Sequence, residues 1–158
     1  MAHQPQDGKF ELEGFIPFRL NQAAERVSLD FAKLYRRAYG MTRPQWRTLA
    51  NLGQHGRLTA REICDLSMQH KTKVSRAVAD LEARKWLKRT INTGDRREEW
   101  LELTAKGRAV FSELSALGQA QDRKLRAALG TQNAKALETA LSALENLENL
   151  TDSPASRG

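Results

Sequence analysis

Apolar residues recur every three or four positions along most of the chain, which is the spacing of an amphipathic helix. The first such stretch predicts a helix from about residue 17 to residue 39, with Pro17 in its first turn and Gly40 as its stop. Four apolar residues precede it, from Phe10 to Ile16, which is too many for a free tail. We expect them to pack against something, such as a partner subunit.

The next two helices are predicted to begin at capping boxes. In a capping box, a Thr hydroxyl and a Gln or Glu side chain three residues later satisfy free backbone N–H groups. The chain has two such pairs, Thr42 with Gln45 and Thr59 with Glu62. We expect Gly53 and Gly56 to end the first of these helices.

A short break at 67–70 separates the third predicted helix from a fourth, which covers about residues 71–84. We expect Leu66 of the third helix to point inward. The fourth helix is predicted to bury one face, made of Val74, Ala77, Val78 and Leu81. Helix, short break and helix is the order of a helix-turn-helix, whose second helix enters the major groove of DNA.

Segments 87–91 and 99–103 predict a β-hairpin whose turn, 92–97, contains two arginines. Thr104 then caps a fifth helix that stops at Gly130, and a sixth helix begins after Thr131, with leucines as far as Leu150. These two helices carry more apolar surface than one small winged domain can cover. Pairing of these two helices with a second copy of the chain explains the excess apolar surface most simply. The alternative is that they fold back on the first helix of the same chain.

The charge distribution favours an anionic partner. The 158-residue chain has a net charge of +7. Residues 41–108 hold 15 Lys and Arg against 8 Asp and Glu, whereas the two flanks together hold equal numbers. All the excess positive charge therefore lies in the middle of the chain, as expected for a polyphosphate partner. A solvated basic surface explains the charge alone equally well.

Other function classes have little support. Cys64 is the single cysteine, which excludes an internal disulfide, and we expect it to be a buried structural thiol. The histidines lack metal-ligand spacing and no nucleophile or acid–base set stands out, so we expect no metal, no cofactor and no enzymatic activity. The sequence has no signal peptide and no membrane-spanning run, so the expected location is the cytoplasm, in association with the nucleoid.

The fourth predicted helix carries side chains suited to reading a groove. Small and hydrogen-bonding residues near its N-terminus can reach base edges without leaving them unpaired. The candidate DNA contacts on this helix are Lys71, Thr72, Lys73, Ser75 and Arg76. In the hairpin turn, Arg96 and Arg97 can reach a phosphate or a narrow minor groove, and Asp95 is expected to orient an arginine.

Several runs of the sequence resemble the MarR family of bacterial regulators, and the similarity covers about residues 17–150. These runs are Gly40-Met41-Thr42, Trp46-Arg47-Thr48-Leu49, Leu58-Thr59-Ala60, Val74-Ser75-Arg76, Leu81-Glu82, Asp95-Arg96-Arg97 and Leu103-Thr104-Ala105-Lys106-Gly107. One position departs from the pattern, because the family usually has Gly after the recognition helix and this chain has Lys85. That residue predicts either a strained left-handed cap or another helix ending.

The resemblance implies a mainly α fold, with a winged helix-turn-helix at 41–108 and dimerisation helices at 10–40 and 109–151. It implies a homodimeric repressor that binds a pseudo-palindromic operator in double-stranded DNA. The major-groove contacts would be Thr72, Lys73, Ser75 and Arg76. Arg97 would enter the minor groove, with Asp95 orienting it.

Many members of the family release DNA when a small phenolic or anionic ligand binds, so a phenolic or carboxylate effector is expected. Arg19 and Trp46 are the candidate effector contacts, although an interface salt bridge and plain core packing explain them as well. The main alternative function is an architectural or replication-associated winged-helix DNA binder without ligand response. A footprint would separate the two, because an architectural protein protects DNA broadly.

Overall fold

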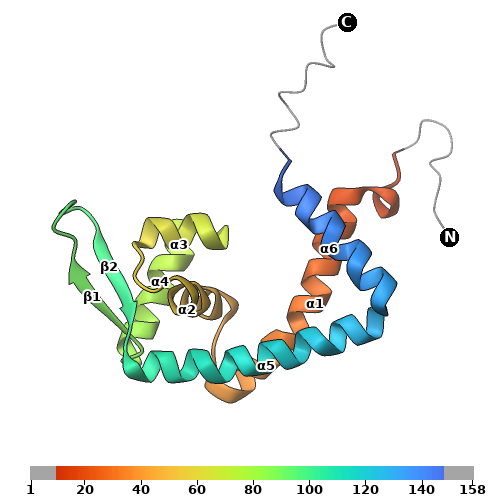
Figure 1. The fold of residues 1–158 in the computed structure, drawn as a ribbon. Helices are drawn as coiled ribbons and strands as arrows, with labels where there is room; N and C mark the ends of the chain where they lie inside the picture. The colour runs from red at the N-terminus through yellow and green to blue at the C-terminus, as the bar shows by residue number, and fades with distance from the viewer. Residues whose placement is uncertain (1–9, 148–158) are drawn as a thin grey trace, which may run out of the picture. The chain divides into compact units, whose positions relative to one another are not determined.

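The computed structural model describes residues 10–147, and that part of the chain is mainly α-helical with one small antiparallel sheet (Figure 1). Its elements in chain order are η1 (Leu12–Gly14), α1 (Ile16–Tyr39), α2 (Arg43–His55), α3 (Ala60–Ser67), α4 (Lys71–Ala83), β1 (Leu87–Ile91), β2 (Glu99–Leu103), α5 (Ala105–Leu129) and α6 (Thr131–Glu145). Contacts divide the chain into two compact units, one ending at Leu117 and the other beginning at Gly118. The predicted fold class is confirmed, and Leu150 lies outside the described residues.

Both predicted capping boxes are present. Thr42 Oγ1 accepts from the Gln45 backbone N–H at 3.4 Å, and Gln45 Oε1 accepts from the Thr42 N–H at 3.0 Å. Thr59 and Glu62 form the same reciprocal pair at 3.3 and 2.7 Å. The helices α2 and α3 therefore begin where the sequence predicts.

Two expectations about these helices are wrong. Gly53 does not end α2, which continues to His55 and is capped by Gly56 at a φ of 82°. A Cβ on Gly53 would lie 2.4 Å from the ring of Phe111 on α5, so this glycine permits close helix packing. Leu66 is half exposed, because the buried face of the short helix α3 consists of Ile63 and Ser67.

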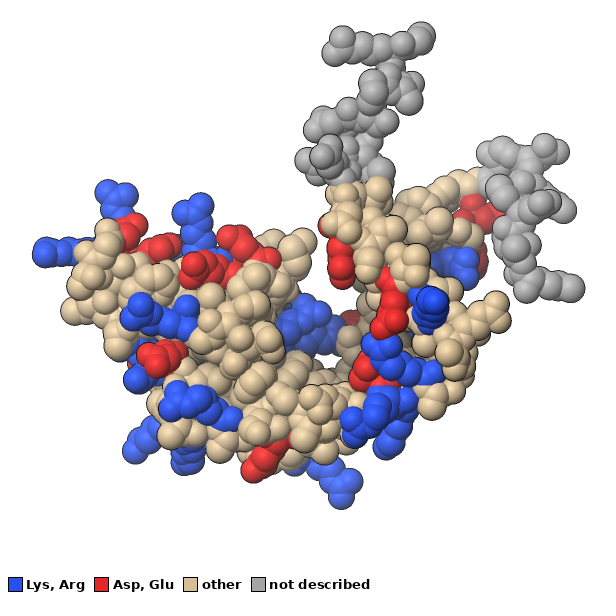
Figure 2. Space-filling view, in the orientation of Figure 1, with Lys and Arg blue, Asp and Glu red and all other residues tan. Residues whose placement is uncertain are grey.

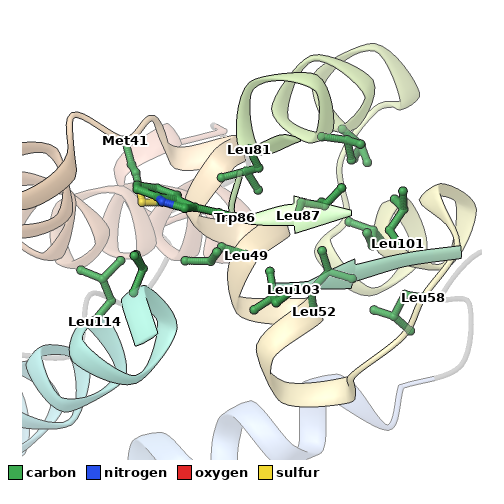
Figure 3. Close-up of a cluster of buried hydrophobic side chains, with 14 of the residues drawn as sticks. Met41, Leu49, Leu52, Leu58, Leu81, Trp86, Leu87, Leu101, Leu103 and Leu114 are labelled. Carbon is green, nitrogen blue, oxygen red and sulfur yellow. The ribbon is translucent and has the colours of Figure 1, made fainter. Parts of the chain in front are cut away.

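The core of the winged unit forms where α4 meets the hairpin. All four residues of the predicted inner face of α4 are at most 2% exposed. Figure 3 shows the side chain of Trp86 beside Met41, with Leu87, Leu101 and Leu103 of the hairpin in the same cluster. The hairpin pairs Leu87 with Leu103, and its strand bounds agree with the prediction.

A bridge fastens the hairpin to the segment before α3. Leu58 N–H donates to the Leu101 carbonyl at 3.1 Å, and Leu101 N–H donates to the Leu58 carbonyl at 2.8 Å. Since α3 begins two residues after Leu58, this bridge sets the position of the wing beside the helix-turn-helix.

The hydrogen bonds at the end of α4 explain how Lys85 can stand where the family usually has Gly. Trp86 N–H donates to the Leu81 carbonyl at 3.0 Å and Lys85 N–H donates to the Glu82 carbonyl at 2.8 Å, which is the hydrogen-bond pattern of a Schellman motif. Lys85 occupies the left-handed position of this motif with a φ of 60°. The usual helix ending is therefore kept, at a strain of ~1 kcal/mol for a residue with a Cβ.

Replacing Lys85 with Gly is expected to raise the free energy of unfolding by about 0.5–1 kcal/mol, because glycine adopts a left-handed conformation without strain. Urea denaturation followed by circular dichroism measures the change. Lys85→Ala is the matched control, since alanine removes the same charged side chain but keeps the strain. Equal stabilities of the Gly and Ala variants would show that the cap is unstrained.

The segment from Leu103 to Gly107 fastens the start of α5 to the end of α4. Thr104 N–H donates to the Trp86 carbonyl at 3.0 Å, and Thr104 Oγ1 donates to the Lys85 carbonyl at 2.8 Å. The same Oγ1 accepts from the Gly107 N–H at 3.1 Å, which confirms Thr104 as the cap of α5. A Cβ on Gly107 would lie only 2.0 Å from the Trp86 carbonyl oxygen. Thr and Gly at this spacing are therefore structural requirements of the wing.

Arg84 joins the end of α4 to the end of α1. Its guanidinium donates to the carbonyls of Tyr39 at 2.5 Å and Gly40 at 3.2 Å, and it lies 4.8 Å over the ring of Trp86. The Tyr39 hydroxyl donates to the carboxylate of Glu113 on α5, and this bond raises the pKa of Tyr39. The ends of α1 and α4 and the first half of α5 are thus linked by polar contacts.

Candidate nucleic-acid interface

The five candidate residues of α4 all lie on its exposed face. Lys71, Thr72, Lys73, Ser75 and Arg76 are exposed, whereas Val74, Ala77, Val78 and Leu81 are buried behind them. The helix is held at its back by the buried side chain of Gln45, whose amide donates to Asp80 at 2.9 Å. This bond fixes the rotation of α4 against α2, so the exposed face is presented in one orientation.

The turn between α3 and α4 is fixed by its own hydrogen bonds. The Ser67 hydroxyl donates to the Ile63 carbonyl, and Gln69 Nε2 donates to Ser67 Oγ at 2.9 Å. Gln69 N–H donates to the Cys64 carbonyl at 3.1 Å while Met68 takes the left-handed conformation, with a φ of 53°. These bonds hold the turn between the two helices of the motif in one conformation.

The tip of the wing is built by two side chains that hold backbone N–H groups. The nearly buried Asn92 accepts at Oδ1 from Gly94 N–H at 3.0 Å and from Asp95 N–H at 3.2 Å. Asp95 Oδ1 then accepts from the Arg97 backbone N–H at 3.0 Å. The expectation that Asp95 orients an arginine side chain is not what these contacts show, because the carboxylate holds the backbone of the turn.

An ion-pair network joins the wing to α4. Arg89 Nε lies 2.9 Å from a carboxylate oxygen of Glu82, and its Nη1 lies 2.9 Å from one of Glu99. Both carboxylates raise the pKa of Arg89. Sequence reasoning did not single out Arg89, although its partners in the adjacent helix and strand are acidic.

A cleft of about 770 Å³ opens between the wing and the N-terminal ends of α3 and α4. Its lining includes the basic side chains Arg61, Lys71, Arg89, Arg96 and Arg97. The structure therefore brings Lys71 together with both wing arginines, whereas Thr72, Lys73, Ser75 and Arg76 do not line the cleft. Figure 2 shows basic side chains at the end of the molecule that carries the hairpin, interspersed with acidic ones.

Cys64 packs against the core cluster but also lines this cleft and is only half buried, so the expectation of a buried thiol is wrong. The reason is that α3 turns Ile63 and Ser67 inward, and Cys64 follows Ile63 on the flank of the helix. Among residues 10–147, no group of His, Cys, Asp and Glu side chains is arranged to hold a metal ion.

The two candidate effector residues lie in different surroundings. Trp46 packs edge-on against Phe31 at 5.1 Å between ring centroids and stacks on Tyr35 at 5.9 Å. Arg19 is exposed on α1, more than three turns before Phe31, which by helix rise is ~18 Å away. Within one chain the structure does not bring Arg19 and Trp46 together.

An exposed polar helix behind a short bracing helix, followed by a basic hairpin, defines a winged helix-turn-helix protein of the DNA-binding class. Residues 39–98 match the sequence model of the MarR family. The resemblance to that family is thereby confirmed, and the fold is that of MarR family transcriptional regulators. None of the described helices is long and apolar enough to cross a membrane.

Solved structures, among them one of a MarR family regulator, resemble the chain over nearly their whole length. A MarR family transcriptional regulator from Silicibacter pomeroyi DSS-3 is 26% identical, with a TM-score of 0.74 over 87% of this chain and 98% of that one. BpsR of Bordetella bronchiseptica, whose DNA binding is regulated by 6-hydroxynicotinic acid, is 20% identical, with a TM-score of 0.77 over 89% and 100%.

A third similar structure is that of NadR in complex with 4-hydroxyphenylacetate. It is 23% identical, with a TM-score of 0.73 over 92% of this chain and 100% of that one. No curated protein sequence matches the chain significantly.

Proposed function

We propose that the protein is a homodimeric repressor that binds a pseudo-palindromic operator, with α4 in the major groove and Arg97 in the minor groove. The observation that carries this proposal is the division of α4 into a buried apolar face and an exposed face of five polar or basic side chains. An exposed face of that composition near a helix N-terminus suits hydrogen bonding to base edges. It is followed by a wing whose turn holds two exposed arginines.

The dimer is supported by apolar side chains that water reaches in a single chain. The exposed leucines of α6 and of the segment just after it are Leu137, Leu141, Leu144 and Leu147. The exposed apolar residues before α1 and in its first turns are Phe10, Leu12, Phe15, Ile16 and Leu20. Leu137, Leu141 and Leu144 form a stripe at helical spacing, and α6 buries no residue in the described chain. A second copy offers self-complementary apolar surface to both regions.

On this proposal, residues 10–40 and 109–151 form the dimerisation region and 41–108 form the DNA-binding domain. A small phenolic or carboxylate effector regulates DNA binding, as a compound of this kind does for BpsR. The candidate contacts for such a ligand remain Arg19 and Trp46, which a single chain does not bring together. The protein works in the cytoplasm on nucleoid DNA and has no catalytic activity.

The deciding experiment selects bound duplexes from a random pool and measures the mass of the complex. We expect the selected duplexes to share an inverted repeat, because two copies related by a twofold axis read two half-sites. Light scattering should give a dimer without DNA and two chains per selected duplex. Selection without any consensus would support the architectural alternative, and a monomeric mass with intact cooperative unfolding would refute the dimer.

A further inference from the structure

The cleft beside the wing is an electrostatically unbalanced cavity. Of its five basic residues, only Arg89 is neutralised, by its ion pairs with Glu82 and Glu99. Among the described residues, no ion pair involves Arg61, Lys71, Arg96 or Arg97. Like charges around one cavity repel each other, so the arrangement is stabilised when an anion enters it.

The anion is identified by the two elements that border the cleft. The N-terminal end of α4 lies on one side and the wing arginines lie on the other. In the proposed complex, α4 occupies the major groove and the wing reaches the neighbouring minor groove. The two grooves of a duplex are separated by one sugar–phosphate strand, which must therefore pass over the space between α4 and the wing.

We propose that this strand crosses the cleft, and that Arg61 and Lys71 bind its phosphates. The inference rests on the proposed function and assigns two residues within it. Lys71 changes from a candidate for base contact to a phosphate contact, and Arg61 of α3 joins the interface. Phosphate contacts fix the register of a protein on the duplex and carry no sequence information themselves.

An acidic residue in the cleft, Glu98, provides a second and independent test of the proposal. Its half-buried side chain lines the same cleft, and it forms no ion pair with any described residue. A carboxylate beside the strand repels its phosphates. Removing that charge should therefore strengthen DNA binding, which a misfolded variant cannot do.

The first test measures the affinity for a random-sequence duplex over a range of salt concentrations. Arg61→Ala and Lys71→Ala should each lower the slope of log affinity against log salt by about one unit, because each variant displaces one counterion fewer. Each variant should lose the same factor of affinity for the selected operator as for the random duplex. Arg123→Ala, which removes an exposed arginine of α5 far along the sequence from the cleft, is the matched control and should leave the slope unchanged.

Glu98→Gln should bind the same random duplex about two- to fivefold more tightly at low salt, with the gain shrinking as salt screens the charge. Slopes of Arg61→Ala and Lys71→Ala equal to that of Arg123→Ala would overturn the proposal, as would unchanged affinity of Glu98→Gln. If the wild-type protein bound no duplex in a salt-dependent manner, the proposed function itself would fail. The two failures are therefore distinguishable.

Neutral methylphosphonate linkages locate the contact on the strand. Placed singly along the selected operator, such a linkage should weaken wild-type binding most between the major-groove and minor-groove positions of a half-site. Arg61→Ala should lose nothing further at that linkage, because both changes remove the same interaction. If the affinity losses caused by Arg61→Ala and by the methylphosphonate added in full at every linkage, Arg61 would not contact the phosphates, and its assignment would be overturned.

Discussion

Replacing Gly107 with Ala should lower the free energy of unfolding by about 2–4 kcal/mol, which is large for the addition of one methyl group. The new Cβ would meet the Trp86 carbonyl oxygen at 2.0 Å, and a backbone atom cannot move aside as the end of a flexible side chain can. To relieve the clash, α5 must shift away from the end of α4. The shift breaks the bonds by which Thr104 holds the carbonyls of Lys85 and Trp86.

Urea denaturation measures this loss, and Gly94→Ala is the matched control. A Cβ on Gly94 would lie at an ordinary 3.4 Å from Asn92 Oδ1, so the free energy of unfolding of Gly94→Ala should differ from that of the wild type by no more than ~0.5 kcal/mol. A Gly107→Ala protein as stable as the control would mean that the close approach of α5 to Trp86 does not exist in solution.

Arg97→Ala should weaken operator binding by about 1–3 kcal/mol and lower the salt slope by about one unit. The guanidinium is exposed at the wing turn, and a narrow minor groove concentrates the negative potential that attracts it. Fluorescence anisotropy at several salt concentrations measures both effects. Normal affinity of this variant would remove the wing from the proposed interface.

Two substitutions of Asp95 separate the role of its charge from that of its hydrogen bond. Asp95→Ala breaks the bond to the Arg97 N–H, so it should loosen the turn and weaken binding, but less than Arg97→Ala does. Asp95→Asn keeps an oxygen at that place and removes the negative charge, so it should bind at least as tightly as the wild type. If both variants bound DNA more tightly than the wild type, the conformation of the turn would contribute nothing to affinity, and only the negative charge of Asp95 would matter.

Local features of the fold were predictable because neighbouring residues determine them. The capping boxes at Thr42 and Thr59 need only a partner three residues away, and both helices begin there. The hairpin strands follow from two short runs suited to strands on either side of a turn. The buried face of α4 follows from helical spacing alone, and the exposure of the candidate DNA contacts follows with it.

Features that depend on distant parts of the chain were missed. Gly53 is typical of a helix end in the sequence, but it lies inside α2 because the Phe111 ring packs on it. The sequence placed Asp95 beside Arg97 but could not tell that its carboxylate accepts from the backbone N–H of Arg97, since backbone and side-chain donors are equally near along the chain. Arg61 was overlooked because nothing in the sequence places it in the cleft that also contains Arg96 and Arg97.

The contacts of Arg84 have a mechanical consequence for any signal that arrives through the first helix. A hydrogen bond from a charged donor contributes about 1.5–3 kcal/mol, and Arg84 makes two such bonds to the end of α1 besides its contact with Trp86. The free energy by which one bound ligand affects another is typically about 1–3 kcal/mol. Breaking both bonds would cost at least as much as such a ligand supplies, so a displacement of α1 also moves the end of α4. Arg84 therefore couples the end of α1 to the end of α4, and Arg84→Ala would weaken this coupling to the packing of Tyr39 on Trp86, whose ring centroids lie 5.6 Å apart, while leaving each helix folded.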